Sequence, residues 1–284
     1  MCSSDLEDGT FSGPNFGGGG SPSLKTLFRA ATQAVPDPTG PGSVYDVWLK
    51  SKSGDTTKLT FGNLGGGSDF SGFYHHIGIP SGGIGFDGPD GIYHSMYDSY
   101  DWMSRFGDPT YTVHRAGAQL VGVILGRIAN ADLLPLDYAA FGAEMDGLVA
   151  QLDSGLAKKQ WGGSTVSTQP LKDALDHFTA VARAFNAARD TAHPNADRAR
   201  RVNHALMQVE RRLTRPEGLV SRPWFKSLQF AADLDNGYAT MAFPSVNEAI
   251  RYADAATTNR ELTDLVTRVD QARAALVEAA AALR

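Results

Sequence analysis

The sequence predicts an α/β domain over residues 1–134, followed by an all-α helical bundle over residues 135–284. Glycine is concentrated in the first part, where 20 of the 31 glycines lie at or before Gly91. From Pro109 onward, apolar residues recur with helical periodicity, and Leu134-Pro135 interrupts that pattern. A chain of 284 residues exceeds the usual size of one hydrophobic core, so two domains are expected.

The first part is expected to consist of short elements joined by glycine-rich loops. Pro22 opens a helix whose apolar stripe ends at Ala31, a Pro and Gly loop covers residues 36–42, and residues 77–80 form a buried strand. The glycines at 17–20, 65–67 and 82–85 are assigned to loops. Because ligands bind beyond the carboxyl ends of strands in open sheets, residues 82–94 are expected near a site.

The second part shows amphipathic helices, each with one apolar stripe. A long helix over 113–128 precedes the break at Pro135, and further helices are predicted over 171–185, 202–213 and 262–283. Ser245 and Glu248 have the spacing of a capping box, which predicts a short helix after Pro244. The arginines of the third helix are expected to form a solvated face or to meet an acidic partner subunit: Arg198, Arg200, Arg201, Arg211 and Arg212.

Composition excludes several classes of protein. The net charge of -5 and the absence of a Lys/Arg run argue against a nucleic-acid partner. The only cysteine is Cys2, so no disulfide framework or thiolate metal site is expected. No stretch reaches the roughly 18 apolar residues of a membrane segment, and no signal peptide follows Met1. The first residues read like a start inside a longer gene, so localisation stays open, and a secreted or periplasmic parent protein is compatible with the sequence.

Seven histidines are the first candidates for metal chemistry, and no pair has the H-E-x-x-H spacing. His75 and His76 are expected to flank a helix end, and His114, His177, His193 and His204 to be structural or exposed. His94 differs, because it follows a glycine-rich loop, where a ligand can be held over a cleft. On spacing alone, a metal-ligand role and a structural or solvent-facing role are equally supported for His94.

Several blocks together resemble the glutamate carboxypeptidase II and transferrin receptor family of di-zinc exopeptidases. They are Leu64-Gly65-Gly66-Gly67-Ser68-Asp69-Phe70, Ile77-Gly78-Ile79-Pro80-Ser81-Gly82, Tyr93-His94-Ser95-Met96-Tyr97-Asp98-Ser99-Tyr100 and Asp108-Pro109. Later blocks resemble its helical dimerisation domain: Leu133-Leu134-Pro135-Leu136, Gly218-Leu219, Arg222-Pro223-Trp224, Asn236-Gly237-Tyr238-Ala239 and Phe243-Pro244. The resemblance implies that residues 1–134 are the carboxy-terminal part of a zinc peptidase catalytic domain and that residues 135–284 pair two subunits.

The resemblance also implies a zinc role for two residues. His94 corresponds to a ligand of one of two zinc ions, and Asp8 is the second candidate, although Asp5 or Glu7 could be confused with it and an exposed loop acid is nearly as well supported. Two such ions hold and activate a hydroxide between them. The family's other histidine, its bridging aspartate and its two glutamates would lie upstream of Asp8. This polypeptide alone is therefore expected to have little or no peptidase activity.

Substrate contacts follow from the same resemblance. Tyr93 is placed to hydrogen-bond the tetrahedral intermediate, with a core aromatic role equally open, and Gly66 and Gly67 shape a pocket floor through close backbone approach. The family's acid-binding arginines fall at Gly83 and Gly85, its lysine falls at Gly237 beside the retained Tyr238, and Ser68 replaces an asparagine. A substrate carboxylate would lose its bidentate partners, so peptides with less charged residues are expected.

The sequence is compatible with three functions. The leading one is a zinc-dependent aminopeptidase, carboxypeptidase or dipeptidase, here truncated, that works as a homodimer through residues 135–284. The alternative is a non-catalytic transferrin receptor-like dimeric scaffold or receptor, and the third is a helical half that acts alone as a dimerisation module. The aromatic residues at 97, 100, 102 and 106 are assigned to packing between the sheet and the first long helix.

Overall fold

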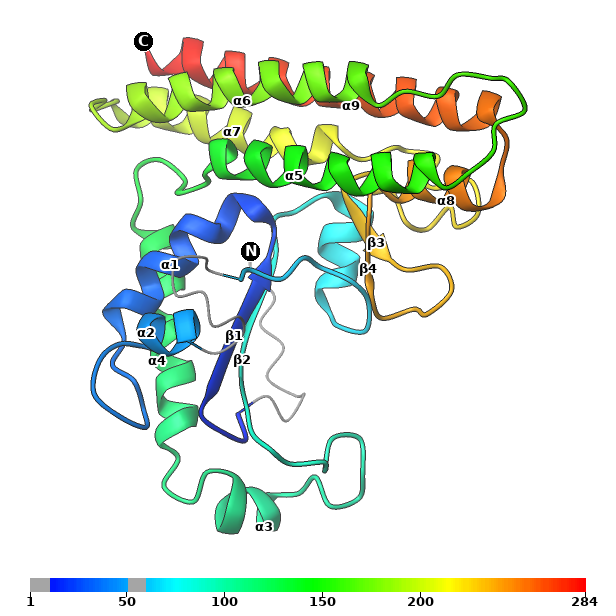
Figure 1. Ribbon diagram of the computed structural model, residues 1–284. Helices are drawn as coiled ribbons and strands as arrows, with labels where there is room; N and C mark the ends of the chain where they lie inside the picture. Colours follow the sequence, from blue (N-terminus) through cyan, green and yellow to red (C-terminus); the bar gives the residue numbers. More distant parts are fainter. Residues whose placement is uncertain (1–10, 51–59) are drawn as a thin grey trace.

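The protein is described by a computed structural model that covers residues 11–50 and 60–284. A small α/β part lies beneath a layer of long helices, as Figure 1 shows. The first part contains β1 (Asn15–Gly20), η1 (Pro22–Leu24), α1 (Lys25–Ala34), α2 (Val44–Lys50), η2 (Gly72–His76), β2 (Gly82–Asp87), α3 (Tyr100–Trp102), η3 (Met103–Gly107) and α4 (Thr112–Ala129). The second contains α5 (Tyr138–Ala157), α6 (Gln169–Arg189), α7 (Ala196–Arg212), β3 (Phe230–Ala232), β4 (Thr240–Ala242), α8 (Pro244–Tyr252) and α9 (Ala255–Leu283).

The sheet of the first part is built from glycine-rich strands. β1 pairs antiparallel with β2, with Gly17 opposite Gly85 and Gly19 opposite Gly83. A Cβ atom on Gly19 would lie 2.8 Å from the carbonyl oxygen of Gly62, which bridges the other edge of β1. The two glycine runs at 17–20 and 82–85 are therefore strands, and their assignment to loops was wrong because bare backbone lets neighbouring chains approach this closely.

The predicted strand over 77–80 is irregular, and Ile77 is about half exposed. A π-helical turn, η2, precedes it and ends at His75 and His76, which confirms that these histidines flank a helix end. The aromatic cluster was also assigned wrongly. Tyr97, Tyr100 and Phe106 are between 64% and 79% exposed, because α3 and η3 lie beyond the start of α4 instead of between α4 and the sheet.

Long helices make up the second part. The predicted helices over 171–185, 202–213 and 262–283 are confirmed as α6, α7 and α9, and the arginines of α7 lie on its exposed face. Helix α5 was not predicted, because Gly142, Gly147 and Gly155 interrupt its apolar pattern. The all-α description was incomplete, since β3 and β4 form an antiparallel hairpin in this part.

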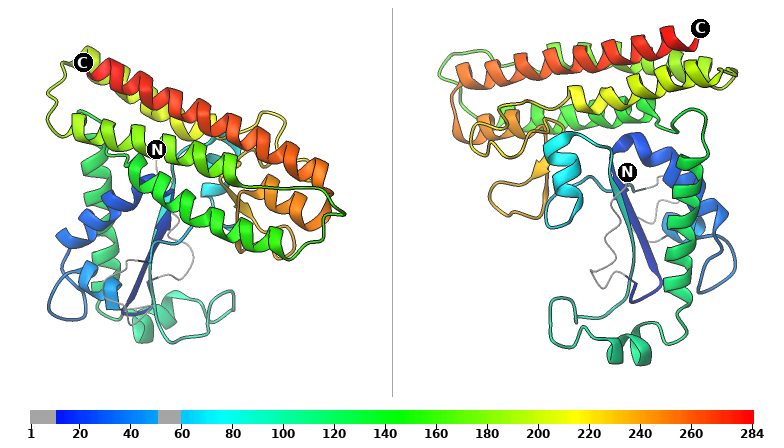
Figure 2. Two further views of the ribbon diagram at one scale, coloured as in Figure 1. Left: turned by 45° about the horizontal axis from the view of Figure 1, so that its top comes forward. Right: turned by 180° about the vertical axis from the view of Figure 1, so that it is seen from behind.

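The two parts share a buried boundary beneath α5 and α7 (Figure 2). The Ser23 hydroxyl donates a hydrogen bond to Glu210, and the Asp137 amide donates one to the Ser23 carbonyl. Tyr138 is buried, and its hydroxyl donates to the carbonyl of Leu206. Within the described residues, no helix has the length and apolar character needed to cross a membrane. The division of the chain at residue 134 stays a prediction.

Candidate functional site

The loop between β2 and α3 contains Tyr93 and His94. Both side chains are exposed, and their rings stack with centroids 3.9 Å apart and an angle of 18° between their planes. His94 has a left-handed backbone, with φ of 58°. This conformation is uncommon for a residue other than glycine and is enriched at functional turns. The structure thus places the His94 imidazole on the surface, and Tyr93 is not a core residue.

A zinc centre at His94 would need further His, Cys, Asp or Glu side chains beside it. Among residues 11–50 and 60–284, no group of three or more His, Cys, Asp or Glu side chains could hold a metal ion. Asp8, the second predicted ligand, lies outside the described residues. The described part of the chain therefore does not by itself fit a zinc centre, which usually takes three or four protein ligands.

A second predicted group is brought together by the fold. Gly65, Gly66 and Gly67 lie against the turn between β3 and β4, which contains Gly237 and Tyr238. The Gly66 amide donates a 2.9 Å hydrogen bond to the Tyr238 carbonyl, and a Cβ atom on Gly66 would lie 2.1 Å from the Gly237 carbonyl oxygen. The backbone at Gly66 is therefore closely approached by the β3–β4 turn of the same chain, and the role of Gly66 and Gly67 in a substrate pocket stays a prediction.

The Tyr238 ring completes this junction. A Cβ atom on Gly67 would lie 2.6 Å from the ring, and the Tyr238 side chain remains 62% exposed. The Thr240 hydroxyl donates to the Asn63 carbonyl at 2.8 Å, which joins β4 to the same glycine-rich segment. An exposed aromatic face and bare backbone therefore meet on one surface, which we call the Gly66–Tyr238 junction.

The other residues predicted to bind substrate do not all lie at this junction. The Ser68 carbonyl accepts from the Ser71 amide at 3.1 Å and follows Gly67 directly. Gly83 and Gly85 lie in β2, and Gly83 has open space where a side chain would be. The loop with Tyr93 and His94 follows the far end of β2, and the views of Figures 1 and 2 agree that it lies apart from the β3–β4 hairpin.

Residues 166–277 match the transferrin receptor-like dimerisation domain. The chain is 31% identical to a probable glutamate carboxypeptidase of Arabidopsis thaliana over 86% of its own length and 34% of that protein's. It is 32% identical to a probable glutamate carboxypeptidase of Arthroderma benhamiae, over 73% of this chain and 29% of that protein. It is 26% identical to an aminopeptidase of Rattus norvegicus, over 86% of this chain and 34% of that protein.

The chain belongs to the glutamate carboxypeptidase II and transferrin receptor family. It spans about a third of the length of the curated relatives it matches. Their names place it in a family of peptidases. The β3–β4 turn and α8 lie inside the part that matches the family's dimerisation domain, whereas Gly66 and His94 lie outside it.

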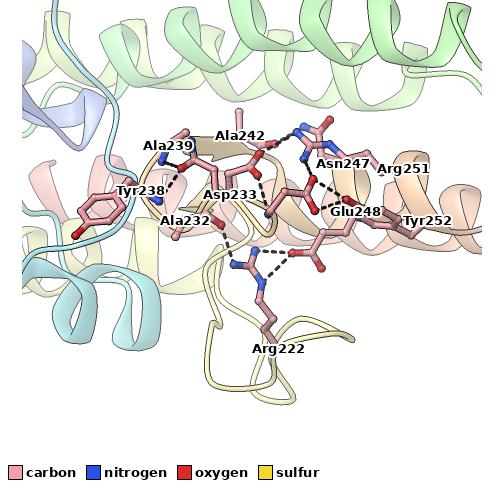
Figure 3. Close-up of polar contacts among 12 residues, drawn as sticks. Arg222, Ala232, Asp233, Tyr238, Ala239, Ala242, Asn247, Glu248, Arg251 and Tyr252 are labelled. Carbon is pink, nitrogen blue, oxygen red and sulfur yellow. Dashed lines mark hydrogen bonds and ion pairs between the residues drawn. The ribbon is translucent and has the colours of Figure 1, made fainter.

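A network of charged residues around the β3–β4 turn escaped the sequence analysis (Figure 3). Arg222 donates through Nε and Nη2 to Glu248 and through Nη1 to the Ala232 carbonyl. The Ser221 hydroxyl donates to the other oxygen of Glu248. The helix after Pro244 is confirmed as α8, but the predicted capping box was wrong, because Glu248 turns to Arg222 instead of to the helix start.

A cavity of about 160 Å³ opens beside this network. Its lining includes Leu234, Glu248, Ala249 and Tyr252 and is mostly apolar. None of the described residues predicted to bind metal or substrate lines it. Small-molecule sites in proteins usually reach 300 Å³ or more, and we assign this cavity no role.

Proposed function

We propose that the protein is a zinc-dependent exopeptidase to which this chain supplies the Gly66–Tyr238 junction and a histidine ligand. The observation that supports the proposal is the contact between Gly66 and Tyr238, two predicted substrate-binding residues from different parts of the chain. The relatives of this chain include proteins named as a probable glutamate carboxypeptidase and as an aminopeptidase. His94 would serve as one zinc ligand, with Asp8 as the second candidate and the remaining ligands supplied from outside the described residues.

The substrate-binding part of the proposal concerns a peptide end that lies against the junction. The exposed Tyr238 ring offers an apolar face and a hydroxyl, whereas the space over Gly66 and Gly67 is filled by the Gly237 carbonyl and the Tyr238 ring, so a peptide would lie against the ring itself. Exposed Asp69 follows Ser68, whereas Asp235 on the turn is paired with Arg251. The Asp69 carboxylate disfavours a substrate carboxylate beside it, so we propose peptides without an acidic residue at this position.

We also propose that two copies associate through residues 135–284. This assignment rests on the match of residues 166–277 to a dimerisation domain. Static light scattering on the full-length gene product should give twice the mass of one chain, and a monomer at micromolar concentration would contradict the assignment.

The peptidase proposal is tested on the full-length gene product. Zinc content is measured by mass spectrometry of the purified protein, and hydrolysis is measured with unblocked dipeptides and tripeptides. His94→Ala should lower both, whereas His177→Ala, at an exposed histidine on α6, should change neither. A protein without zinc and without hydrolysis would instead support the non-catalytic scaffold. The 284-residue chain alone should show little or no hydrolysis, because a zinc site that lacks ligands loses affinity.

A further inference from the structure

The turn that presents Tyr238 has a defined backbone. Asn236 Oδ1 accepts hydrogen bonds from the amides of Tyr238 and Ala239, at 2.8 and 2.7 Å. Gly237 has φ of 77°, a left-handed conformation that glycine adopts without strain. The Asp233 amide donates to the Ala239 carbonyl at 2.7 Å, which closes the turn. The turn between Asp233 and Ala239 is thereby closed by its own hydrogen bonds.

Two carboxylates of this turn bind one arginine of α8. Arg251 Nη2 lies 2.9 Å from Asp233 Oδ2, and Nη1 lies 3.0 Å from Asp235 Oδ2. The Tyr252 hydroxyl donates to the Asp235 carboxylate at 2.6 Å. The guanidinium holds the pKa of the Asp233 carboxyl below its usual range, so that carboxylate is charged at neutral pH. The two arms of one planar group thus bridge two points of the turn.

The opposite side of the turn packs against the backbone of the glycine-rich segment at residues 65–67. The Gly66 amide binds the Tyr238 carbonyl, and the Gly65 backbone is close enough that a Cβ atom there would lie 2.1 Å from the same oxygen. Figure 3 shows Tyr238 at one end of the cluster, Arg251 and Tyr252 at the other, and Asp233 between them. The turn is therefore held between α8 and the glycine-rich segment.

We propose that Arg251 is a positioning residue for substrate binding, which acts by fixing the turn that places Tyr238 at the Gly66–Tyr238 junction. The effect on substrate rests on the proposed function, whereas the effect on the turn does not. Tyr238 is largely exposed and its ring touches Gly67, so the direction of the ring depends on the backbone below it. Without the Arg251 ion pairs, the turn would let the Tyr238 ring adopt several positions, and a peptide would then have to order the ring on binding.

The first measurement is hydrogen exchange of the full-length gene product, followed by mass spectrometry of peptides that cover residues 233–240. Arg251→Met should speed exchange of the Tyr238 and Ala239 amides about tenfold, and Arg251→Lys should give an intermediate rate, since an ammonium cannot form the same fork. Arg273→Met is the matched control. Arg273 is 38% exposed against 39% for Arg251, and it pairs with Asp270 on α9. Unchanged exchange in Arg251→Met would overturn the proposal.

The second measurement is the kinetics of peptide hydrolysis by the same protein. Arg251→Met should raise KM about tenfold with little change in kcat, because a positioning defect weakens binding and leaves the reacting groups in place. Tyr238→Ala should do the same, and the double variant should be no worse than Tyr238→Ala alone. Additive losses would show that Arg251 does not act through Tyr238 and would overturn the proposal.

The two readouts separate two kinds of failure. A wild-type protein that hydrolyses no peptide refutes the proposed function, and the exchange rates still decide whether Arg251 fixes the turn. If Arg251→Met unfolds the protein, Arg251→Lys and Tyr252→Phe replace it. Tyr252→Phe removes the second bond to Asp235 and should speed exchange to a smaller extent.

Discussion

The hydroxyl of Ser23 donates a 2.5 Å hydrogen bond to the Glu210 carboxyl group and so connects η1 to α7 across 187 positions of the sequence. Glu210 is fully buried, and burial raises its pKa to about 7 from an ordinary value near 4.5. Burial raises the pKa values of the Tyr74 and Tyr138 phenols, and the nearby Glu210 carboxylate raises them further. A carboxyl group that holds its proton near neutral pH therefore lies between the two parts of the molecule.

Glu210 should make the free energy of unfolding fall as the pH rises. Between about pH 4.5 and pH 7 the folded state binds more protons at this position than the unfolded state, so stability is full below pH 4.5 and is lost as the pH passes 7. The loss at pH 8 should reach about 3 kcal/mol. Glu210→Gln keeps an acceptor for Ser23 and should remove this slope.

Urea unfolding at pH 5, 6.5 and 8 measures the difference between wild type and Glu210→Gln. The variant should gain stability relative to wild type at each step upward in pH. A constant difference across the three values would mean that Glu210 is charged in the folded protein throughout.

His75 should produce the opposite slope at lower pH. Its ring is buried beside Phe70 and Phe225, and burial lowers its pKa to about 4 from 6.5. The unfolded chain therefore takes up the proton first, and stability is lost as the pH falls from 6.5 to 4. The loss should approach about 3 kcal/mol. Because Glu210 contributes the opposite slope over an overlapping pH range, the measurement is the difference in thermal stability from wild type: His75→Phe should gain stability relative to wild type as the pH falls from 7 to 4, whereas the exposed His177→Phe should not.

Gly66→Ala should displace the β3–β4 turn. The added methyl group would collide with the Gly237 carbonyl oxygen and with Ala232 Cβ, so the turn or the glycine-rich segment must move. We expect a loss of about 2 kcal/mol or more in unfolding free energy. Gly122→Ala, in open space on α4, should instead stabilise the protein by about 0.5–1 kcal/mol. Equal effects of the two changes would argue against the close contact at Gly66.

Removing Arg222 should destabilise the protein strongly. Its side chain is 15% exposed and that of Glu248 is 9% exposed, so Arg222→Ala leaves a buried carboxylate with only Ser221 as a partner. The expected loss is about 3 kcal/mol by chemical denaturation. Arg200→Ala removes an exposed pair on α7 and should cost about 0.5 kcal/mol or less. Similar losses for both variants would show that the Arg222 pair is solvated in solution.

Local sequence patterns predicted the helices in which apolar residues recur at helical spacing. The apolar stripes of α6, α7 and α9 indicated helices, and they are helices because each stripe packs into one core. The glycine runs of β1 and β2 were wrongly predicted as loops, because glycine signals a turn unless a facing strand needs the space. The family resemblance located Gly66 and Tyr238, and only the fold shows that they touch.

The ion pairs of Arg251 with Asp233 and Asp235, which hold the β3–β4 turn, could not be predicted from local patterns. Asp233, Asp235 and Asn236 beside Gly237 are a strong turn signal, but nothing local indicates that Arg251 binds both aspartates. A charged residue on a helix usually faces solvent, and the pairing depends on where α8 packs against the hairpin.

The hydrogen bond from Thr240 to Asn63 joins residues 177 positions apart. The entropy cost of closing a chain loop rises only slowly with its length, but contacts this distant in sequence slow the search for the native state. We therefore expect the junction to form late in folding, after the segments on both sides have acquired their own structure. Formation of the surface proposed to receive a peptide should thus also mark the last step of folding.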